Sequence, residues 1–179
     1  NIVKEGVRFF YENKVLKIFA IDMIVIATIA YFMIWLYQPM LKKAGIDIVY
    51  FGIVHAGFVI SQILIMNNYE RLERILGSKK RLIFFSSAIT GIMFIIGGLT
   101  TFIPLILLAI IVGGGFGLSR EPLFASYMNK YIPSPKRATV LSTISMMKRF
   151  ALVVLNPVFG LMVDWSLNYT LIILGVKPA

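Results

Sequence analysis

The sequence predicts an all-α protein, a polytopic membrane helical bundle with five complete transmembrane helices and a partial sixth. Two observations lead to this fold class. The 179 residues are 59% hydrophobic and only 15% charged, with a mean hydropathy of +0.86, whereas a soluble domain is about half apolar and about a quarter charged. The apolar residues also gather in uncharged runs close to the roughly 20 residues that cross a hydrocarbon core about 30 Å thick.

The expected helices follow from these uncharged runs and from one proline. Residues 82–119 hold no charge over 38 positions, which is too long for one span and suits two. Pro104 is expected at the turn between them, because proline is favoured at a helix start. We therefore expect complete spans at 18–39, 47–69, 81–100, 103–128 and 138–163, and the start of a sixth at 168–176.

The first 17 residues are expected to form a separate segment before a half-bundle over 18–179. Charged side chains fall on one face of a helix over 1–17, which is typical of a helix lying in the membrane interface. A solvated linker end is the alternative. Because the chain begins at Asn1 without a signal-peptide pattern, we interpret it as an internal piece of a longer protein. The charged face consists of Lys4, Glu5, Arg8 and Glu12.

Lysine and arginine are distributed unequally between the two sets of expected loops. With the N-terminus inside, the inner segments hold twelve of these residues, and the outer segments hold only Lys42 and Lys43. Such a bias predicts that the basic loops are cytoplasmic. We expect a multi-pass protein of a prokaryotic plasma membrane, with a cytoplasmic N-terminus and the lipid bilayer around it. The inner residues are Lys4, Arg8, Lys14, Lys17, Arg71, Arg74, Lys79, Lys80, Arg81, Lys130, Lys136 and Arg137.

Composition and motifs argue against several other function classes. The chain has no cysteine and one histidine, which leaves little for a metal site, so we expect neither a metal nor a cofactor. It contains neither two histidines four apart around a glutamate nor a Gly-x-Ser-x-Gly turn, so we do not expect an enzyme. The net charge of +10 does not indicate a nucleic-acid partner, because the cations stand between apolar runs rather than on the face of a soluble fold.

Polar side chains inside the expected spans are the candidate functional residues, because lipid cannot satisfy them. In the first span, Tyr31 and Trp35 lie on one aromatic and polar face. In the second, His55 and Gln62 are seven residues apart and lie nearly on one line. His55 would carry a proton or bind substrate, or else act as a neutral packing residue. For Asp22, near the inner interface, snorkelling or pairing is the alternative to proton transfer.

The third and fourth spans differ in polarity. The fourth contains "GGGFGLSREP", in which Gly113 and Gly117 allow close helix packing or let the helix bend as a gate would. Arg120 and Glu121 follow, and because adjacent residues on a helix do not face each other, each is expected to pair with a different helix. The third span is the least polar and is expected to face lipid. Its polar side chains are Ser86, Ser87 and Thr90.

The fifth span carries two adjacent cations where a membrane helix would ordinarily carry leucine. Arg149 shares a stripe with Asn156 and two serines, and such a stripe is expected to face protein or water. Lys148 and Arg149 lie roughly 15 Å along the expected helix, at about 1.5 Å per residue. They would pair with Glu121 or Asp22, or line a wet cavity, and Arg149 is favoured for the interior. Alternatively, the helix protrudes and both cations reach the lipid headgroups.

Two segments resemble the major facilitator superfamily. "ERLERILGSKKR", residues 70–81, is similar to its acidic-x-x-Gly-basic-basic loop, with Glu73 or Glu70 at the acidic position and one extra residue, Ser78, after the glycine. "SREPLFASYMNKYIPSPKRATVLS", residues 119–142, resembles the end of the tenth span, the basic loop and the start of the eleventh span in prokaryotic drug-exporter-like members. The matched loop positions are Glu73, Gly77, Lys79, Lys80 and Arg81.

The resemblance covers almost the whole chain and implies the C-terminal half of such a transporter. The five spans would correspond to helices seven to eleven, with the twelfth truncated. Helices seven and ten would line a central cavity, eight and eleven would meet the missing N-terminal six-helix half, and nine would pack outside. The two halves would rock around a site near the bilayer midplane.

The expected function is therefore secondary active transport of a small organic solute by proton- or ion-coupled alternating access. Arg120 and Glu121 are candidate gate or coupling charges. One alternative is the membrane domain of an ATP-driven exporter, whose phosphate-binding loop would lie on a partner because the chain contains none. Another is a membrane-embedded protein that does not transport. The candidates for cavity lining are Tyr31, Trp35, His55, Gln62, Arg149 and Asn156.

Overall fold

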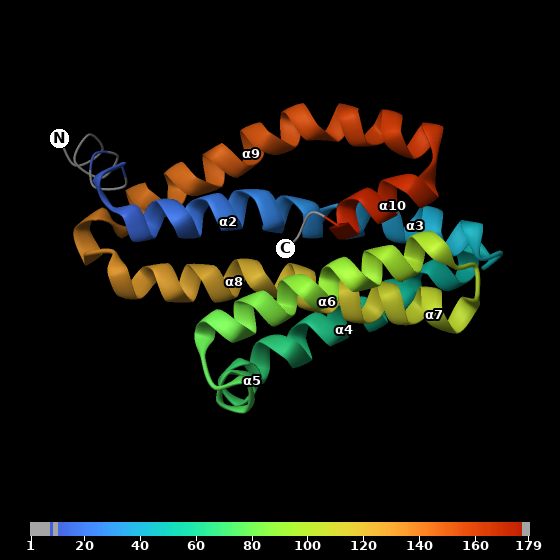
Figure 1. The fold of residues 1–179 in the computed structure, drawn as a ribbon, viewed down its shortest axis with the longest axis horizontal. Helices are drawn as coiled ribbons and strands as arrows, with labels where there is room; N and C mark the ends of the chain where they lie inside the picture. The colour runs from blue at the N-terminus through green and yellow to red at the C-terminus, as the bar shows by residue number, and fades with distance from the viewer. Residues whose placement is uncertain (1–7, 9–10, 177–179) are drawn as a thin grey trace.

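The computed structural model describes residue 8 and residues 11–176 (Figure 1). Within this part of the chain all regular secondary structure is helical, which confirms the all-α fold class. The interfacial segment expected over 1–17 lies mainly outside the described residues. Of its charged face, the structure describes an ion pair in which Arg8 Nε donates to Glu12 Oε1 at 2.7 Å.

Four helices among the described residues are long and apolar enough to cross a membrane. The first expected span is not one of them, because it is divided at Phe32 into α2 (Lys14–Tyr31) and α3 (Met33–Lys43). α2 also includes Lys14, Lys17 and Asp22, which lower its hydropathy. The Phe32 backbone N–H still donates to the carbonyl of Ile29 at 3.1 Å, so α3 continues α2 closely (Figure 1). The four helices are Ile48–Asn67, Lys79–Leu99, Ile103–Lys130 and Ser134–Trp165.

The segment "ERLERILGSKKR" folds as a short helix, a glycine turn and the start of a long helix. α4 (Phe51–Asn67), preceded by one 3-10 turn over Ile48–Tyr50, leads into α5 (Tyr69–Leu76). α5 ends at Gly77, whose φ of +79° is a left-handed conformation that favours glycine. The Ser78 hydroxyl then caps α6 (Lys79–Leu99) by accepting from the Arg81 backbone N–H at 3.2 Å.

The second half of the chain forms two long helices and a short one. α7 (Ile103–Leu108), a π-helical segment (Ala109–Gly113) and α8 (Gly114–Tyr131) follow one another directly, and Pro104 lies in the first turn of α7. α9 (Ser134–Trp165) has 32 residues and is longer than the expected 138–163. It contains Pro157 and curves along its length (Figure 1). α10 (Leu167–Val176) is a shorter apolar helix.

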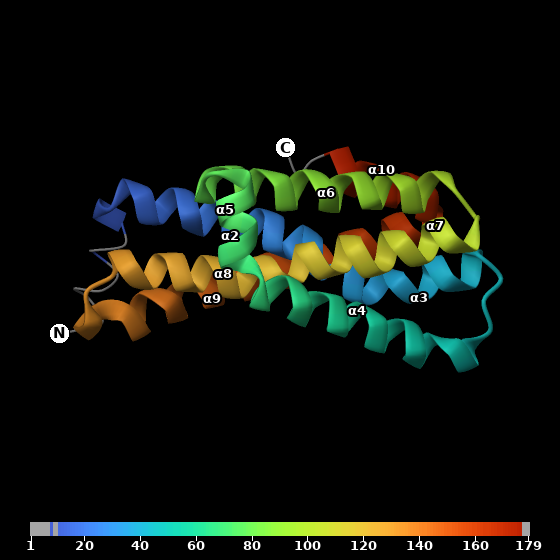
Figure 2. The same ribbon diagram turned by 90° about the horizontal axis from the view of Figure 1, so that it is seen from below.

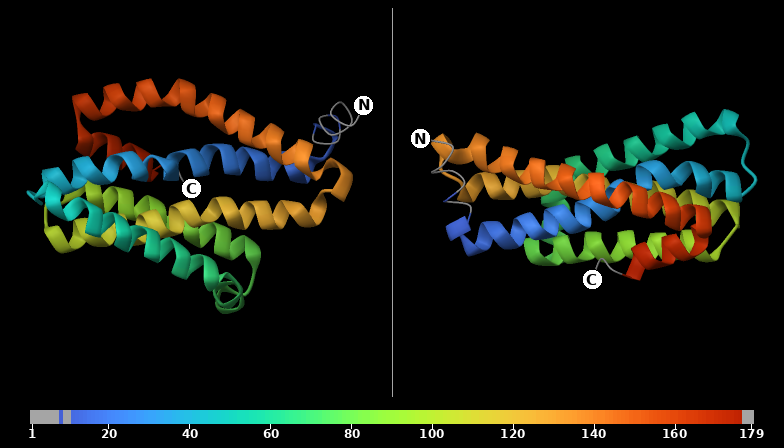
Figure 3. Two further views of the ribbon diagram at one scale, coloured as in Figure 1. Left: turned by 180° about the vertical axis from the view of Figure 1, so that it is seen from behind. Right: turned by 90° about the horizontal axis from the view of Figure 1, so that it is seen from above.

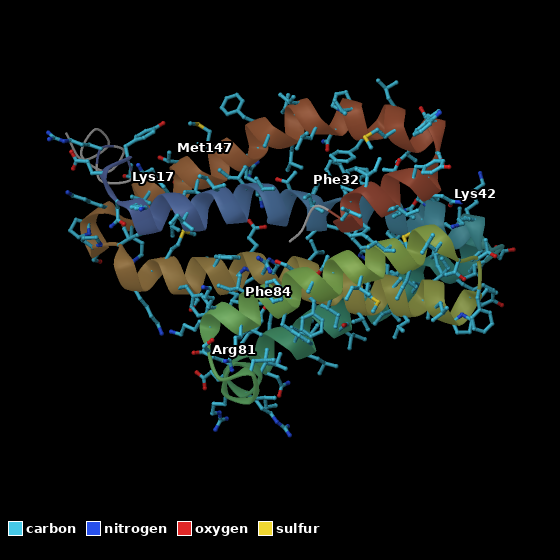
Figure 4. The ribbon with its side chains drawn as sticks, viewed as in Figure 1. Lys17, Phe32, Lys42, Arg81, Phe84 and Met147 are labelled. Carbon is cyan, nitrogen blue, oxygen red and sulfur yellow. The ribbon has the colours of Figure 1, made fainter. Side chains whose placement is uncertain are left out.

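Apart from α5, which lies across the bundle in Figure 2, the described helices run along one long axis, and their turns alternate between two ends of the bundle (Figures 1, 2 and 3). The end that we call the α5 end holds the start of α2, the α4–α5–α6 turns and the α8–α9 loop. The opposite end, called the α7 end, holds the α3–α4, α6–α7 and α9–α10 turns. Figure 4 labels Lys17 toward the α5 end and Lys42 at the α7 end. The described lysines and arginines that the sequence predicts on the inner side of the membrane therefore lie at the α5 end.

The main core lies among α2, α3, α4, α6, the π-helical segment and α10. It includes fully buried Met33, Phe94 and Ile110. α10 packs against α6, and a Cβ built on Gly175 would lie 2.5 Å from the carbonyl oxygen of Gly91. Only glycine permits this approach, because any side chain would collide with the α6 backbone.

α6 has a buried polar face, which was not expected for a span that can face lipid. Its opposite face does expose large apolar side chains, among them Phe84 (Figure 4) and Ile92. The polar face turns inward because α8 presents a donor to it, as described below, and a hydroxyl in hydrocarbon would have no partner. The buried polar residues are Ser86, Ser87 and Thr90.

Candidate functional site

An ion pair joins α8 to α9 in the middle of their length. Lys148 Nζ lies 2.6 Å from Glu121 Oε2. The Lys148 side chain is only 12% exposed, whereas that of Glu121 is 46% exposed. Lys148 stands about 21 Å along α9 from Ser134, at about 1.5 Å per residue, so this is not a helix-end contact. Arg149, the neighbour favoured from the sequence for the interior, is exposed, while the side chain of Asp22 lies outside the described part.

Arg120 turns away from Glu121 and into the bundle. It is fully buried, and its Nη1 donates at 2.6 Å to the Ile83 carbonyl and at 2.6 Å to Ser86 Oγ, both on α6. Its guanidinium also lies over the Phe124 ring, 5.2 Å from the centroid. Arg120 and Glu121 thus pair with different helices, α6 and α9, which confirms the expectation from helical geometry.

A polar groove of about 890 Å³ opens at the α5 end between α5, α6 and α8. On its wall the Tyr127 hydroxyl donates to Glu73 Oε2 at 3.1 Å, and Lys79 Nζ lies 4.8 Å from the Tyr127 ring centroid. Gly77 also lines the groove. Glu73, Gly77 and Lys79 of the expected basic loop therefore gather here, whereas Lys80 and Arg81 are exposed beyond it.

Tyr69 is the first residue of α5 and lies beyond the candidate span Ile48–Asn67. Burial raises the pKa of its phenol to about 12, although Ser119 and the positive charge of Arg120 act in the opposite direction. The phenol therefore stays neutral at physiological pH. The neutral Tyr69 hydroxyl can donate a hydrogen bond, and it lies near Ser119 and Arg120 of α8.

Trp35 and Asn156 come together in a second groove, of about 360 Å³, between α3 and α9. The Phe32 and Phe159 rings, 4.1 Å apart at their centroids, close one part of it. Its other lining residues include Pro39, Gly160 and Asp164.

The remaining cavity candidates do not join this groove. The His55 ring on α4 packs 5.3 Å from Tyr37 and 5.7 Å from Phe58, and its Nδ1 is buried without a hydrogen-bond partner in the described chain. Gln62 and Tyr31 are half-buried. Of the six expected lining residues, Trp35 and Asn156 thus share a groove, and the other four do not line it.

The glycines of α8 and its π-helical segment lie against neighbouring helices. A Cβ on Gly113 would be 2.6 Å from the Met93 Cβ on α6, and one on Gly117 would be 2.9 Å from the Ala30 Cβ on α2. The π-helical stretch ends at Gly113, and such stretches occur often at functional sites. Close packing of neighbouring helices at Gly113 and Gly117 and a local change of helix type, the π-helical segment, therefore occur together.

Sequence reasoning missed three residues of these sites. Ser86 was assigned to a lipid-facing helix, and its spacing of four from Thr90 was the available signal for a polar face. Tyr127 carried no local signal, because its partners are more than 40 residues away in the chain. Asp164 continues the stripe of Asn156 and Gly160 at intervals of four, so the expected polar stripe ended about two turns too early.

Comparison with protein-family models, with curated proteins and with solved structures finds no match. Interpretation of these sites therefore rests on their own geometry and chemistry. Among the described residues, no three His, Cys, Asp or Glu side chains converge as a metal site would require.

Proposed function

We propose that this chain is the C-terminal half of a secondary active transporter of the major facilitator type, which moves a small organic solute by proton- or ion-coupled alternating access. The observation that carries the proposal is the Lys148–Glu121 pair, which lies inside two helices of membrane-spanning length, about two thirds along Ile103–Lys130 and near the middle of Ser134–Trp165. Charges at such a depth are costly, and those that persist typically mark substrate or ion pathways. A membrane anchor has no need of them.

The arrangement of the helices supports the same proposal. If α2–α3 counts as a first span and α10 as part of a sixth, the four candidate spans become the proposed five crossings and a partial one. In the most apolar 18-residue stretch of each candidate span, 6% of the residues of Ile48–Asn67 and none of those of Ser134–Trp165 are buried, against 44% for Lys79–Leu99 and 50% for Ile103–Lys130. α4 and α9 thus keep open faces for the N-terminal six-helix half.

The proposed roles follow from burial. Glu121 is the candidate coupling carboxylate, because it is half exposed and held by a nearly buried cation. Arg120 is better suited to anchor α8 on α6 than to gate, because it is fully enclosed. Arg149 and Asn156, exposed on α9, would face the cavity between the two halves. Tyr31, Trp35, His55 and Gln62 would contribute from α2, α3 and α4.

Transport by the complete protein tests the proposal. We expect solute movement in proteoliposomes to follow an imposed proton gradient, to collapse with a protonophore and to need no ATP. Arg149→Leu is expected to lower the rate at least tenfold, since it removes a cation from the cavity wall. Residues 1–179 alone should not transport, because half of the cavity is missing. A requirement for ATP hydrolysis, or no movement of any solute in a broad screen, would refute the proposal.

The proposed orientation in a prokaryotic plasma membrane rests on the unequal distribution of cations. We expect Lys80→Cys, at the α5 end, to react with an impermeant maleimide only after the cells are permeabilised. Val49→Cys is the matched control at the α7 end, where Val49 is 76% exposed, and it should react in intact cells. Because the chain has no cysteine of its own, each variant introduces a single thiol into it. The reverse labelling pattern would exclude a cytoplasmic α5 end.

A further inference from the structure

The span formed by α7, the π-helical segment and α8 has two halves that differ in polarity. We call residues 102–113 the α7 half and residues 114–131 the α8 half. Every residue of the α7 half is apolar or glycine, so its side chains form no hydrogen bonds. The rotation of the α8 half is fixed by Arg120, Glu121 and Tyr127, each of which contacts a specific partner on another helix. Of the two halves, only the α7 half can therefore turn about its axis without breaking polar contacts of its side chains.

The π-helical segment Ala109–Gly113 joins the two halves. Its backbone hydrogen bonds span five residues instead of the four of an α-helix, so its turn holds one residue more. Conversion of such a turn to α-helix rotates one half against the other by about 100° and shifts it by about 1.5 Å. The junction is also locally weak, because glycine disfavours helix. Packing nevertheless requires glycine here, since a Cβ on Gly114 would collide with the Phe58 ring.

Thr90 on α6 holds the α7 half at this junction. Its hydroxyl, on a residue that is 1% exposed, donates to the Ser86 carbonyl at 2.8 Å and to the Gly113 carbonyl at 3.4 Å. A hydroxyl has one proton, so the two carbonyls share it. If Gly113 moved away, the proton would stay bonded to Ser86. Because the buried hydroxyl would keep an acceptor, release of this contact costs little.

We propose that the α7 half is a movable gate, which rotates against the fixed α8 half when the π-helical segment converts to α-helix, and that the Thr90 hydroxyl is its latch. Ile106 is fully buried, and its neighbours Leu105 and Leu107 are also aliphatic. Rotation would exchange one aliphatic side chain in the core for another, so the buried apolar area would change little. The inference rests on the proposed function only in that this gate would open and close the path of the solute at the α7 end.

Distances between spin labels in the complete protein, reconstituted in lipid nanodiscs, test the rotation. Any cysteine outside this chain is first replaced. Labels at Ile103→Cys and Leu105→Cys, used in turn, are each paired with a label at Leu161→Cys on α9. Ile103 and Leu105 are both partly exposed and, being two residues apart, lie about 200° apart around the helix. Because both labels of a pair lie in this chain, rocking of the two transporter halves as rigid bodies changes neither distance.

We expect two distance populations for each pair, and the second population should be longer at one α7 site and shorter at the other. A turn of about 100° moves a side-chain tip by about 8 Å, because a helix with its side chains is about 10–12 Å wide. Ser126→Cys on the α8 half, paired with the same α9 site, is the control and should give one population. Changes of the same sign at Ile103 and Leu105 would indicate a tilt of α7 and overturn the rotation.

Four variants test the latch and the junction. Thr90→Val keeps the shape of the side chain without its hydroxyl, and it should raise the ratio of the rotated to the latched population about fivefold. Thr90→Ser keeps the hydroxyl and should leave this ratio unchanged. Ser87→Ala removes another buried hydroxyl from α6 and should also leave it unchanged. Deletion of Val112 should abolish the second population, because the junction then has the residue number of an α-helix with both halves in their original orientation.

Equal ratios in Thr90→Val and Ser87→Ala would refute the latch. A single population at both α7 sites, in the wild type and in Thr90→Val, would refute the movable gate. The distances are measured without solute or ion gradient, so they do not depend on transport. Two populations in a protein that transports nothing would refute only the proposed function, whereas an unchanged transport rate after deletion of Val112 would refute only the gate.

Discussion

Glu121→Gln is expected to destabilise the protein much more than Lys148→Met, although the two changes break the same ion pair. Removing the glutamate leaves Lys148, which is only 12% exposed, without its counter-charge, whereas removing the lysine leaves a carboxylate that is 46% exposed. Breaking a fully buried pair costs about 3–5 kcal/mol. We expect roughly 3 kcal/mol for Glu121→Gln and about 1 kcal/mol for Lys148→Met, since exposure reduces the cost.

A double-mutant cycle measures this asymmetry. Reversible unfolding in mixed detergent micelles gives the four free energies, and we expect the double variant to be more stable than Glu121→Gln alone. Transport should be lost in the double variant, because a proposed coupling carboxylate is absent even when folding is restored. Equal costs for the two single variants would contradict the burial difference on which the prediction depends. A double variant that still couples transport to the proton gradient would exclude Glu121 as the coupling group.

Arg120→Met is expected to lower the free energy of unfolding by about 3 kcal/mol. The guanidinium is fully buried and donates two short hydrogen bonds to α6, to the Ile83 carbonyl and to Ser86 Oγ. Hydrogen bonds that involve a charged group contribute about 1.5–3 kcal/mol each, and their loss leaves two acceptors unsatisfied. Replacement of the cation by an apolar side chain of similar length offsets part of this cost.

Arg149→Met is the matched control, because Arg149 is exposed on α9. We expect its effect on unfolding to stay within about 0.5 kcal/mol, together with a large loss of transport. Measuring unfolding and transport for both variants thus distinguishes a residue that holds α8 against α6, Arg120, from one that acts in transport, Arg149. Arg120→Lys should lower the free energy of unfolding less than Arg120→Met does, since the lysine ammonium can keep one of the two hydrogen bonds to α6. If Arg120→Met and Arg149→Met unfold at the same denaturant concentration, Arg120 does not hold α8 against α6.

Local signals in the chain predicted the helical class and much of the element order. The uncharged run over 82–119 is divided into α6 and α7 near Pro104, and Gly77 ends α5 in the left-handed conformation that glycine favours. Helical spacing also predicted that Arg120 and Glu121 point to different neighbours. Each of these features depends on residues close together in the sequence, where backbone geometry decides the outcome.

Only the tertiary structure showed which polar side chains on different helices contact one another. Arg149 and Lys148 are adjacent and equally charged, yet Lys148 meets Glu121, and periodicity within α9 cannot indicate which one faces α8. Ser86 turns toward Arg120 for the same reason, because the rotation of α6 about its axis depends on its packing against α8 and α10.

The sequence by itself therefore determined an all-α chain with helices of membrane-spanning length, because hydrophobicity and charge along the chain decide which segments can enter lipid. Only the tertiary structure decided which polar groups meet and that Asp164 shares a groove with Trp35. Those contacts join helices far apart in the chain, and they depend on how each helix is rotated and tilted against the others.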